Sequence, residues 1–110
     1  MFSPEMKKGS MEMLILSMLA ENESHGYEIG KLIEQRSGGL IEFRISTLYS
    51  VLYRMEKSGW IKGRWVEKPG ERRRCYYRLT PAGKKVLLAQ EKTWREFVGV
   101  VNDLLGSTNA

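Results

Sequence analysis

The sequence has only one cysteine, Cys75, and one histidine, His25, among its 110 residues. A lone cysteine cannot form a disulfide within the chain, which favours a reducing, cytoplasmic setting. One cysteine and one histidine are also too few for a Cys/His zinc site within one chain. His25 has no carboxylate at the spacing of a catalytic motif, and there is no glycine-rich phosphate loop or paired acid site. We therefore predict that the chain holds no metal or cofactor and is not an enzyme.

Long apolar runs are also missing. No stretch approaches the roughly 20 apolar residues that cross a membrane. The first ten residues, MFSPEMKKGS, lack the hydrophobic segment and cleavage site of a signal peptide. Apolar residues make up 42% of the chain and charged residues 28%, a balance typical of a folded, soluble domain. We expect one domain with a modest core and no membrane partner.

Positive charge is concentrated in one stretch of the chain. Between Arg44 and Arg78 there are ten Lys or Arg and three Glu, a net charge of +7, whereas the whole chain carries +5. The remaining residues therefore sum to −2. Such a local concentration of positive charge is typical of a surface that binds phosphate groups.

The basic stretch begins with a predicted helix. Ser46 is a residue type that caps the first turn of a helix, and Gly59 is a type that ends one. Apolar residues recur between them at the spacing of one buried helical face: Leu48, Val51, Leu52 and Met55. The outer face carries hydrogen-bond donors and no acid: Thr47, Tyr49, Ser50, Tyr53, Arg54 and Lys57. A helix face of this composition suits contact with DNA in the major groove.

A basic hairpin follows this helix. Residues 60–66 and residues 72 or 73 to 79 have the composition of strands, joined by a turn over residues 67–71. Pro69 and Gly70 stand in that turn in the order of a type II turn. Four cations lie near its tip: Lys68, Arg72, Arg73 and Arg74. The helix and the hairpin together predict the recognition helix and the wing of a winged helix.

Two helices are expected before this stretch. The first covers about residues 10–20, after a polar start that should be frayed or extended, and it is apolar on all sides. A partner subunit or a deep position in the core would each explain that pattern. The second helix should begin with Ser24 as its cap and end at residues 37–39, with Tyr27 among its buried residues. Residues 40–45 could then form a short extended piece that pairs with the hairpin.

The last helix should begin at Thr80 and Pro81, since threonine caps a helix and proline fits its first position. It continues to about residue 105 and carries a wide apolar stripe: Trp94, Phe97, Val98, Val101, Leu104 and Leu105. A domain this small has little core left to cover such a stripe. We therefore predict that the stripe packs against a second copy of the chain, with packing on its own domain as the alternative.

Four pieces of the sequence, in matching order and spacing, resemble one protein family. They are an apolar first helix, HGYEI, STLYSVLYRMEKSGWI and RRRCYYRLTPAG. The combination resembles the PadR family of bacterial transcriptional regulators over about residues 11–94. The resemblance implies a dimeric winged-helix repressor that binds a pseudo-palindromic operator, and the length resembles the subfamily with a single C-terminal dimerisation helix. One difference is Ser50, where many members of the family carry proline.

The resemblance also implies a place for a small ligand. In members that sense aromatic compounds or drugs, a tryptophan on the last helix lines a cavity between subunits, and Trp94 stands at the matching place. The candidate effector site consists of Trp94, Met11, Ile15, Phe97 and Val98. The candidate dimer interface consists of Leu14, Met18, Trp94, Val98, Val101 and Leu105. Alternatively, Trp94 is simply a large residue of the dimer interface.

We therefore predict a mainly α fold with a small β-hairpin: a winged helix-turn-helix over residues 1–80 and a C-terminal dimerisation helix over residues 81–110. The predicted DNA contacts are Ser46, Thr47, Tyr49, Ser50, Tyr53, Arg54, Lys57, Lys68, Arg72, Arg73 and Arg74. Within this set, the two tyrosines could instead pack against the second helix, and the hairpin cations could be a solvated charge run. A winged-helix module that binds an acidic protein is the alternative to a DNA-binding regulator.

Overall fold

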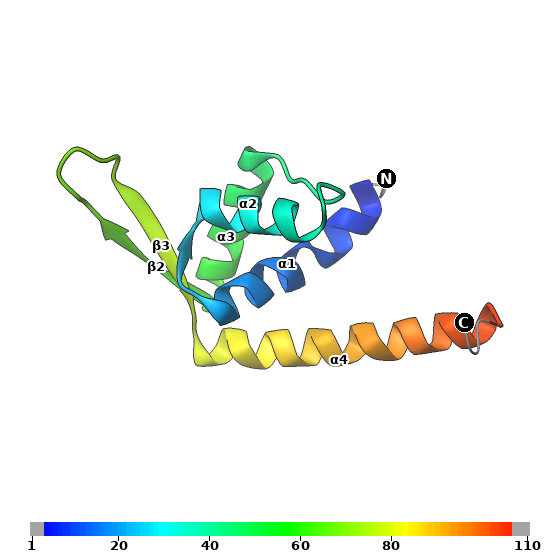
Figure 1. Cartoon of the computed structure of the whole chain (residues 1–110). Helices are drawn as coiled ribbons and strands as arrows, with labels where there is room; N and C mark the ends of the chain where they lie inside the picture. Colours follow the sequence, from blue (N-terminus) through cyan, green and yellow to red (C-terminus); the bar gives the residue numbers. More distant parts are fainter. Residues whose placement is uncertain (1–3, 107–110) are drawn as a thin grey trace.

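The computed structural model describes residues 4–106, which form four helices and three strands (Figure 1). In chain order these elements are α1 (Pro4–Glu21), β1 (Ser24–His25), α2 (Gly26–Arg36), α3 (Ile45–Lys57), β2 (Ile61–Val66), β3 (Arg74–Leu79) and α4 (Pro81–Leu104). Helices α1, α2 and α3 pack together, the β2–β3 hairpin projects from one side of them, and α4 extends past α1 in the other direction (Figure 1). The predicted fold class, mainly α with a small hairpin, is confirmed.

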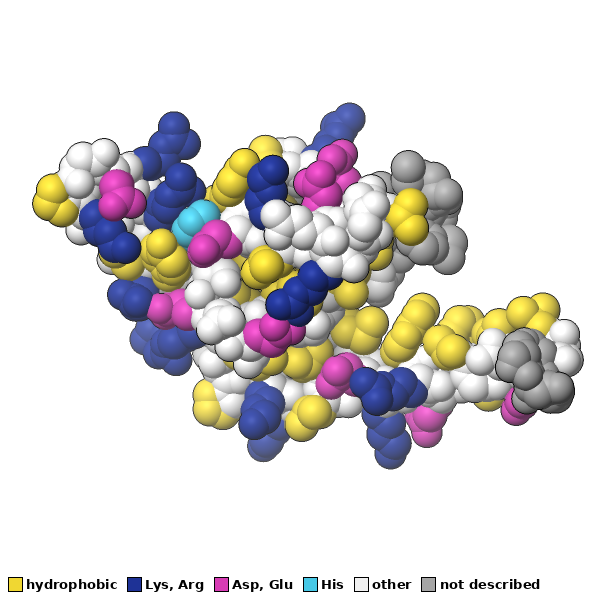
Figure 2. Space-filling model, in the orientation of Figure 1, with side chains coloured by type: hydrophobic (Ala, Val, Ile, Leu, Met, Phe, Trp, Pro, Cys, Tyr) yellow, Lys and Arg dark blue, Asp and Glu magenta, His cyan; other side chains and the backbone are white. Residues whose placement is uncertain are grey.

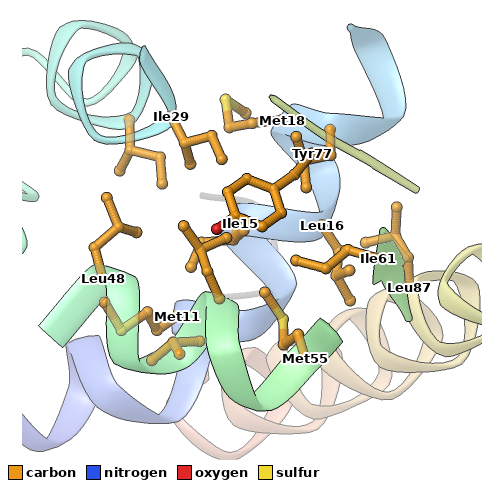
Figure 3. Packing of buried hydrophobic residues seen from close by; sticks show 14 residues of the cluster. Met11, Ile15, Leu16, Met18, Ile29, Leu48, Met55, Ile61, Tyr77 and Leu87 are labelled. Carbon is orange, nitrogen blue, oxygen red and sulfur yellow. The ribbon is translucent and has the colours of Figure 1, made fainter. Parts of the chain in front are cut away.

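The core lies where α1, α2 and α3 meet the base of the hairpin (Figure 3). Its fully buried side chains come from all of these elements: Ile15, Leu16, Ile29, Leu48, Leu52, Met55 and Ile61. The apolar face that the sequence predicted for α3 is therefore buried, Val51 included. Leu87 from the first half of α4 completes the cluster, so the beginning of α4 is fixed to the core.

Strand β3 is the central strand of the sheet, whose order is β1-β3-β2. It pairs antiparallel with β2 along its whole length and with β1 through two residue pairs: Ser24 with Tyr77 and His25 with Tyr76. The prediction that residues 40–45 pair with the hairpin was wrong. Ile41 donates its N–H to the hydroxyl oxygen of Ser37, 2.9 Å away, and not to a strand.

The predicted turn of the hairpin is confirmed. The N–H of Glu71 donates to the carbonyl of Lys68 at 3.0 Å, and Gly70 has a φ of +76°, which glycine adopts without strain. Strand β3 begins only at Arg74. Arg72 and its neighbour Arg73 therefore lie in the loop at the tip and not in a strand.

Two helices begin at residues other than those predicted. Helix α1 begins at Pro4, six residues earlier than expected, since proline is tolerated in a first helical turn. The segment expected to be frayed is therefore helical from Pro4 on, and its residues 1–3 lie outside the described residues. Helix α3 begins directly after Arg44, which is extended with a φ of −61° and a ψ of 138°. Ser46 therefore lies inside the first turn and does not cap it.

Helix α4 begins where the sequence predicts. The Oγ1 of Thr80 accepts a hydrogen bond from the N–H of Gly83 at 3.0 Å, and Pro81 takes the first helical position. The same hydroxyl donates to the carbonyl of Gly59 at 2.6 Å. The start of α4 is therefore tied to the residues that end α3.

His25, and not Ser24, caps α2. The N–H of Glu28 donates to Nδ1 of His25 at 3.3 Å, and the N–H of His25 donates back to the Glu28 carboxylate at 3.1 Å. Ser24 does not cap because it pairs with β3. Tyr27, predicted to be buried, is 52% exposed, because Ile29 faces the core and a residue two positions away points to the other side of a helix.

The capping bond makes the charge of His25 relevant to stability. Burial lowers the pKa of this imidazole below its ordinary value of 6.5, the nearby Glu28 opposes that effect, and the charge of Arg74 adds to it. Nδ1 accepts the capping hydrogen bond only while it carries no proton. As the pH falls, the unfolded chain therefore binds a proton before the folded chain does, so stability is lost below pH 6.5.

We expect the His25→Asn variant to lack this pH dependence, because asparagine caps helices without titrating. Between about pH 7.5 and about pH 5.5, the wild-type protein should lose up to about 1 kcal/mol of unfolding free energy relative to the variant. Hydrogen bonds from Arg36 and Arg64 lower the pKa values of Glu21 and Glu23 below 4.5, so these carboxylates titrate outside that window. Urea unfolding at several pH values measures the difference, and parallel curves for the two proteins would contradict it.

Candidate nucleic-acid interface

The exposed face of α3 and the hairpin carry most of the side chains predicted to contact DNA. Figure 2 shows Lys and Arg side chains gathered over the hairpin, and hydrophobic side chains in a row along α4. All seven residues predicted on α3 are exposed: Ser46, Thr47, Tyr49, Ser50, Tyr53, Arg54 and Lys57. At the hairpin tip Lys68, Arg72 and Arg73 are exposed, and Arg74 is half-buried. Two residues of the α3 set and three of the hairpin set line one cleft: Tyr49, Tyr53, Arg72, Arg73 and Arg74.

This cleft has a volume of about 420 Å³ and lies between α3 and the hairpin. Its lining combines aromatic rings with arginines: His25, Tyr49, Tyr53, Trp65, Tyr77, Arg72, Arg73 and Arg74. Glu56 and Cys75 complete the lining, and the Glu56 carboxylate accepts a hydrogen bond from the N–H of Gly63 at 2.9 Å. Burial raises the pKa values of the Cys75 thiol and of the Tyr77 hydroxyl, so both groups are protonated at neutral pH.

Tyr49 contributes to packing as well as to the surface. Its ring lies against Gly26 of α2, where an added Cβ atom would be 2.6 Å from the ring, yet the residue is 43% exposed. Tyr49 therefore packs against the second helix, as the alternative interpretation of the two tyrosines predicts. Tyr53, one turn further along α3, is 66% exposed, and the ammonium group of Lys57 lies 5.8 Å from its ring centre. Tyr53 is thus available to a partner.

Three arginines of the basic stretch already have carboxylate partners. The pairs are Arg54 with Glu12, Arg64 with Glu23 and Arg73 with Glu67, at N–O distances between 2.5 and 3.5 Å. Among residues 9–106, whose side chains the structure describes, no such partner is found for Lys57, Lys68, Arg72 and Arg74, and the first three of these are exposed. Because an unpaired cation can neutralise a phosphate without first losing a carboxylate, these three are the cations best placed for a nucleic-acid backbone.

The sequence did not indicate that Trp65 belongs to this site. Alternate residues of a strand point to the same face, so Trp65 shares a face of β2 with Ile61. Ile61 is nevertheless buried, whereas Trp65 is 59% exposed. The guanidinium of Arg73 lies 4.4 Å from the centre of the Trp65 ring. The signal that could have placed it is its position at the end of a strand, next to a turn rich in arginine.

The residues predicted for an effector site and a dimer interface fall into two groups. Met11, Ile15 and Met18 lie in the core of the protomer, and Ile15 has no exposed surface. Helix α1 contacts α2, β3 and α4 of the same chain, and Leu14 is partly buried as well, so these four side chains pack within the protomer. The predicted residues on α4 are exposed or half-buried: Trp94, Phe97, Val98, Val101 and Leu105.

The cleft and the exposed face of α3 carry hydrogen-bond donors and positively charged side chains. Such groups can bind phosphate oxygens and the edges of bases. Residues 4–106 contain no group of three or more His, Cys, Asp or Glu side chains placed to hold a metal ion. None of the helices in this range is long and apolar enough to cross a membrane.

Residues 15–89 match the sequence model of the transcriptional regulator PadR-like family. The chain belongs to this family. Its members are DNA-binding transcriptional regulators and not enzymes, so this PadR-like protein is a regulator of transcription.

Solved structures support the assignment. This PadR-like chain is 37% identical to a transcriptional regulator from Clostridium thermocellum, with a TM-score of 0.86 over 94% of this chain and 97% of that one. It is 33% identical to a PadR family transcription regulator from Clostridium difficile, with a TM-score of 0.76 over 87% and 98% of the two chains. A transcriptional regulator of Mycobacterium tuberculosis is 32% identical over 101 residues, or 86% of this chain and 89% of that one. These likenesses confirm the predicted winged-helix fold.

Substitutions at Tyr49 and Tyr53 should separate packing from DNA contact in this PadR-like regulator. Tyr49→Ala should lower the unfolding free energy by roughly 1–2 kcal/mol, because the contact with Gly26 is lost. Tyr53→Ala should change it by less than about 0.5 kcal/mol, because that ring is exposed. Tyr49→Phe keeps the ring and tests the hydroxyl alone. Urea unfolding measures stability and fluorescence anisotropy measures duplex binding; equal stability of the two alanine variants would contradict the packing of Tyr49.

Proposed function

We propose that this protein is a homodimeric, sequence-specific repressor that acts in the cytoplasm on a pseudo-palindromic operator. Each protomer inserts α3 into the major groove, and the hairpin contacts the adjacent backbone. The observation that carries the proposal is the outer face of α3, whose exposed side chains are hydrogen-bond donors and cations. The one acid of this helix, Glu56, is held by the N–H of Gly63 in the hairpin.

The proposed contacts divide by their chemistry. On α3, Arg54 and Lys57 reach phosphates or guanine edges, and the hydroxyl-bearing residues bond phosphate oxygens or touch thymine methyl groups. These residues are Ser46, Thr47, Tyr49, Ser50 and Tyr53. On the hairpin, Lys68 and Arg72 neutralise phosphates directly, whereas Arg73 has to exchange Glu67 for a phosphate. Arg74 contributes charge from its half-buried position.

The second half of α4 is the proposed dimer contact, so that residues 1–80 bind DNA and residues 81–110 hold the dimer together. Its hydrophobic side chains form a row along the helix (Figure 2), and several are widely exposed: Trp94, Phe97, Val100, Leu104 and Leu105. Extended apolar patches on soluble proteins mark contact surfaces. Two copies of the stripe would cover one another and place the two α3 helices in successive major grooves, roughly 34–36 Å apart.

An effector at the α4 contact would release the operator by changing that separation. Trp94 and Phe97 support this part of the proposal, since their ring centres are 6.4 Å apart and both rings are exposed in the protomer. Val98 lies beside them and is half-buried. Because aromatic rings stack on one another, this surface favours a small aromatic or drug-like ligand.

A duplex from upstream of the protein's own gene tests DNA recognition. Fluorescence anisotropy should show tighter binding to this duplex than to a scrambled duplex of equal length, with an affinity that falls steeply as salt increases. Lys68→Gln and Arg72→Gln should each reduce the salt slope by about one unit, whereas Lys92→Gln on α4 should leave it unchanged. Equal affinity for both duplexes would contradict sequence specificity. No binding at low salt would favour the protein-binding alternative.

The mass of the assembly tests the dimer. Light scattering should give twice the 12.7 kDa of a single chain for the wild-type protein. The double variant Phe97→Glu, Leu104→Glu should shift toward the single chain, because it buries two carboxylates in the contact. Both residues are exposed in the protomer, so its helical circular dichroism should be retained. Lys92→Glu, outside the stripe, is the control for added negative charge, and a wild-type mass of one chain would rule out the dimer.

A further inference from the structure

The cleft between α3 and the hairpin has more aromatic surface than a DNA duplex can use. Tyr53 and Trp65 both line it and are among the most exposed rings of the described chain. A duplex presents phosphates and base edges to its surroundings and keeps the faces of its bases stacked inside. Contact with phosphates therefore uses the arginines and the tyrosine hydroxyls of the cleft but not its rings. Each ring has one cation beside it: the Lys57 ammonium lies 5.8 Å from the centre of the Tyr53 ring, and the Arg73 guanidinium lies 4.4 Å from the centre of the Trp65 ring.

Positive charge surrounds these rings. Arg72, Arg73 and Arg74 line the cleft together with a single acid, Glu56. The carboxylate of Glu56 already accepts a hydrogen bond from the backbone of β2, and Arg73 is paired with Glu67. Arg72 has no carboxylate partner in the described part of the chain. Arg74 has none either, but it is half-buried, so Arg72 is the exposed guanidinium of the cleft that is not yet neutralised. The cleft therefore attracts an anion.

We propose that this cleft is a binding site for a small planar aromatic anion, separate from the α4 surface. Its volume of about 420 Å³ lies within the range of ligand pockets. The ring of the ligand stacks on Tyr53 and Trp65, on the side of each ring away from its cation, and its carboxylate pairs with Arg72. A ligand held there occupies the space that the operator needs beside α3, and so it competes with DNA; this last step depends on the function proposed above.

Isothermal titration calorimetry of the full chain with 2-naphthoate measures the site without DNA. Saturable binding at one site per chain is expected, weakened roughly three- to tenfold by Tyr53→Leu and by Arg72→Gln. Two matched controls should bind as the wild-type protein does. Tyr27→Leu removes a similarly exposed ring outside the cleft, and Lys62→Gln removes one charge from the same hairpin. The neutral analogue 2-acetylnaphthalene should bind more weakly than 2-naphthoate.

Trp94→Leu separates this site from the α4 surface and should leave 2-naphthoate binding unchanged. Absence of binding, binding that survives both cleft substitutions, or binding that is lost in Trp94→Leu would each overturn the proposal. Stronger binding of a single-stranded oligothymidylate at the same residues would overturn it in favour of unpaired nucleotides.

Competition is measured with the operator duplex by anisotropy. The duplex should be released at 2-naphthoate concentrations that match the calorimetric dissociation constant. Cleft-dependent ligand binding in a protein that recognises no operator would overturn the proposed function and leave the site standing. Operator binding that 2-naphthoate does not affect would overturn the competition.

Discussion

The arrangement of the helices around the hairpin depends on the pairing of β3 at both of its edges. The pairing with β2 forms the hairpin, the pairing with β1 fixes the start of α2, and α4 begins directly after the strand. Tyr77 is where these constraints meet, since it pairs with Ser24 on one edge and Gly63 on the other while its ring is buried in the core. Gly63 leaves no space for a side chain, because a Cβ atom would lie 2.6 Å from the sulfur of Cys75. The N–H of the same Gly63 donates to the Glu56 carboxylate of α3 at 2.9 Å, which connects the hairpin to α3 beside the cleft.

Not all of the positive charge in the basic stretch is available to bind a partner, because several of its arginines already form ion pairs. Arg54 pairs with Glu12 of α1, and Arg64 pairs with Glu23 just before β1. Exposed ion pairs usually contribute less than about 1 kcal/mol each, so their main effect here is on position: they connect α3 and β2 to the same N-terminal part of the chain. In the DNA complex proposed above, phosphates compete with these carboxylates for the guanidinium groups. The pairs therefore orient α3 and β2, and they would lower the affinity of the proposed complex to some extent.

Local sequence signals predicted much of the fold, but they failed where the local structure depends on residues far away in the sequence. The turn at Gly70, the cap at Thr80 and the apolar face of α3 follow from neighbours within a few residues, and the structure confirms them. Strand β1 could not be predicted in this way, because two residues form a strand only when β3 is beside them. The same pairing removed Ser24 from its expected role as a cap. For the candidate site, the exposed residues of α3 were foreseen, but the cleft was not, since Trp65 reaches it only through the path of β2.

Two aromatic surfaces lie in different parts of the chain, and a ligand on each would act on DNA binding in a different way. In the proposed dimer, a ligand at Trp94 lies on a contact that both protomers share. It therefore has to change the separation of the two α3 helices, which needs two arrangements of the dimer. A ligand beside Tyr53 acts on its own protomer without any rearrangement. The proposed pseudo-palindromic operator needs both α3 helices, and because the free energies of two half-sites add, their affinities multiply. Filling one cleft is therefore enough to lose most of the specific affinity, and the fixed position of the hairpin, set by β3, keeps that cleft formed in the free protein.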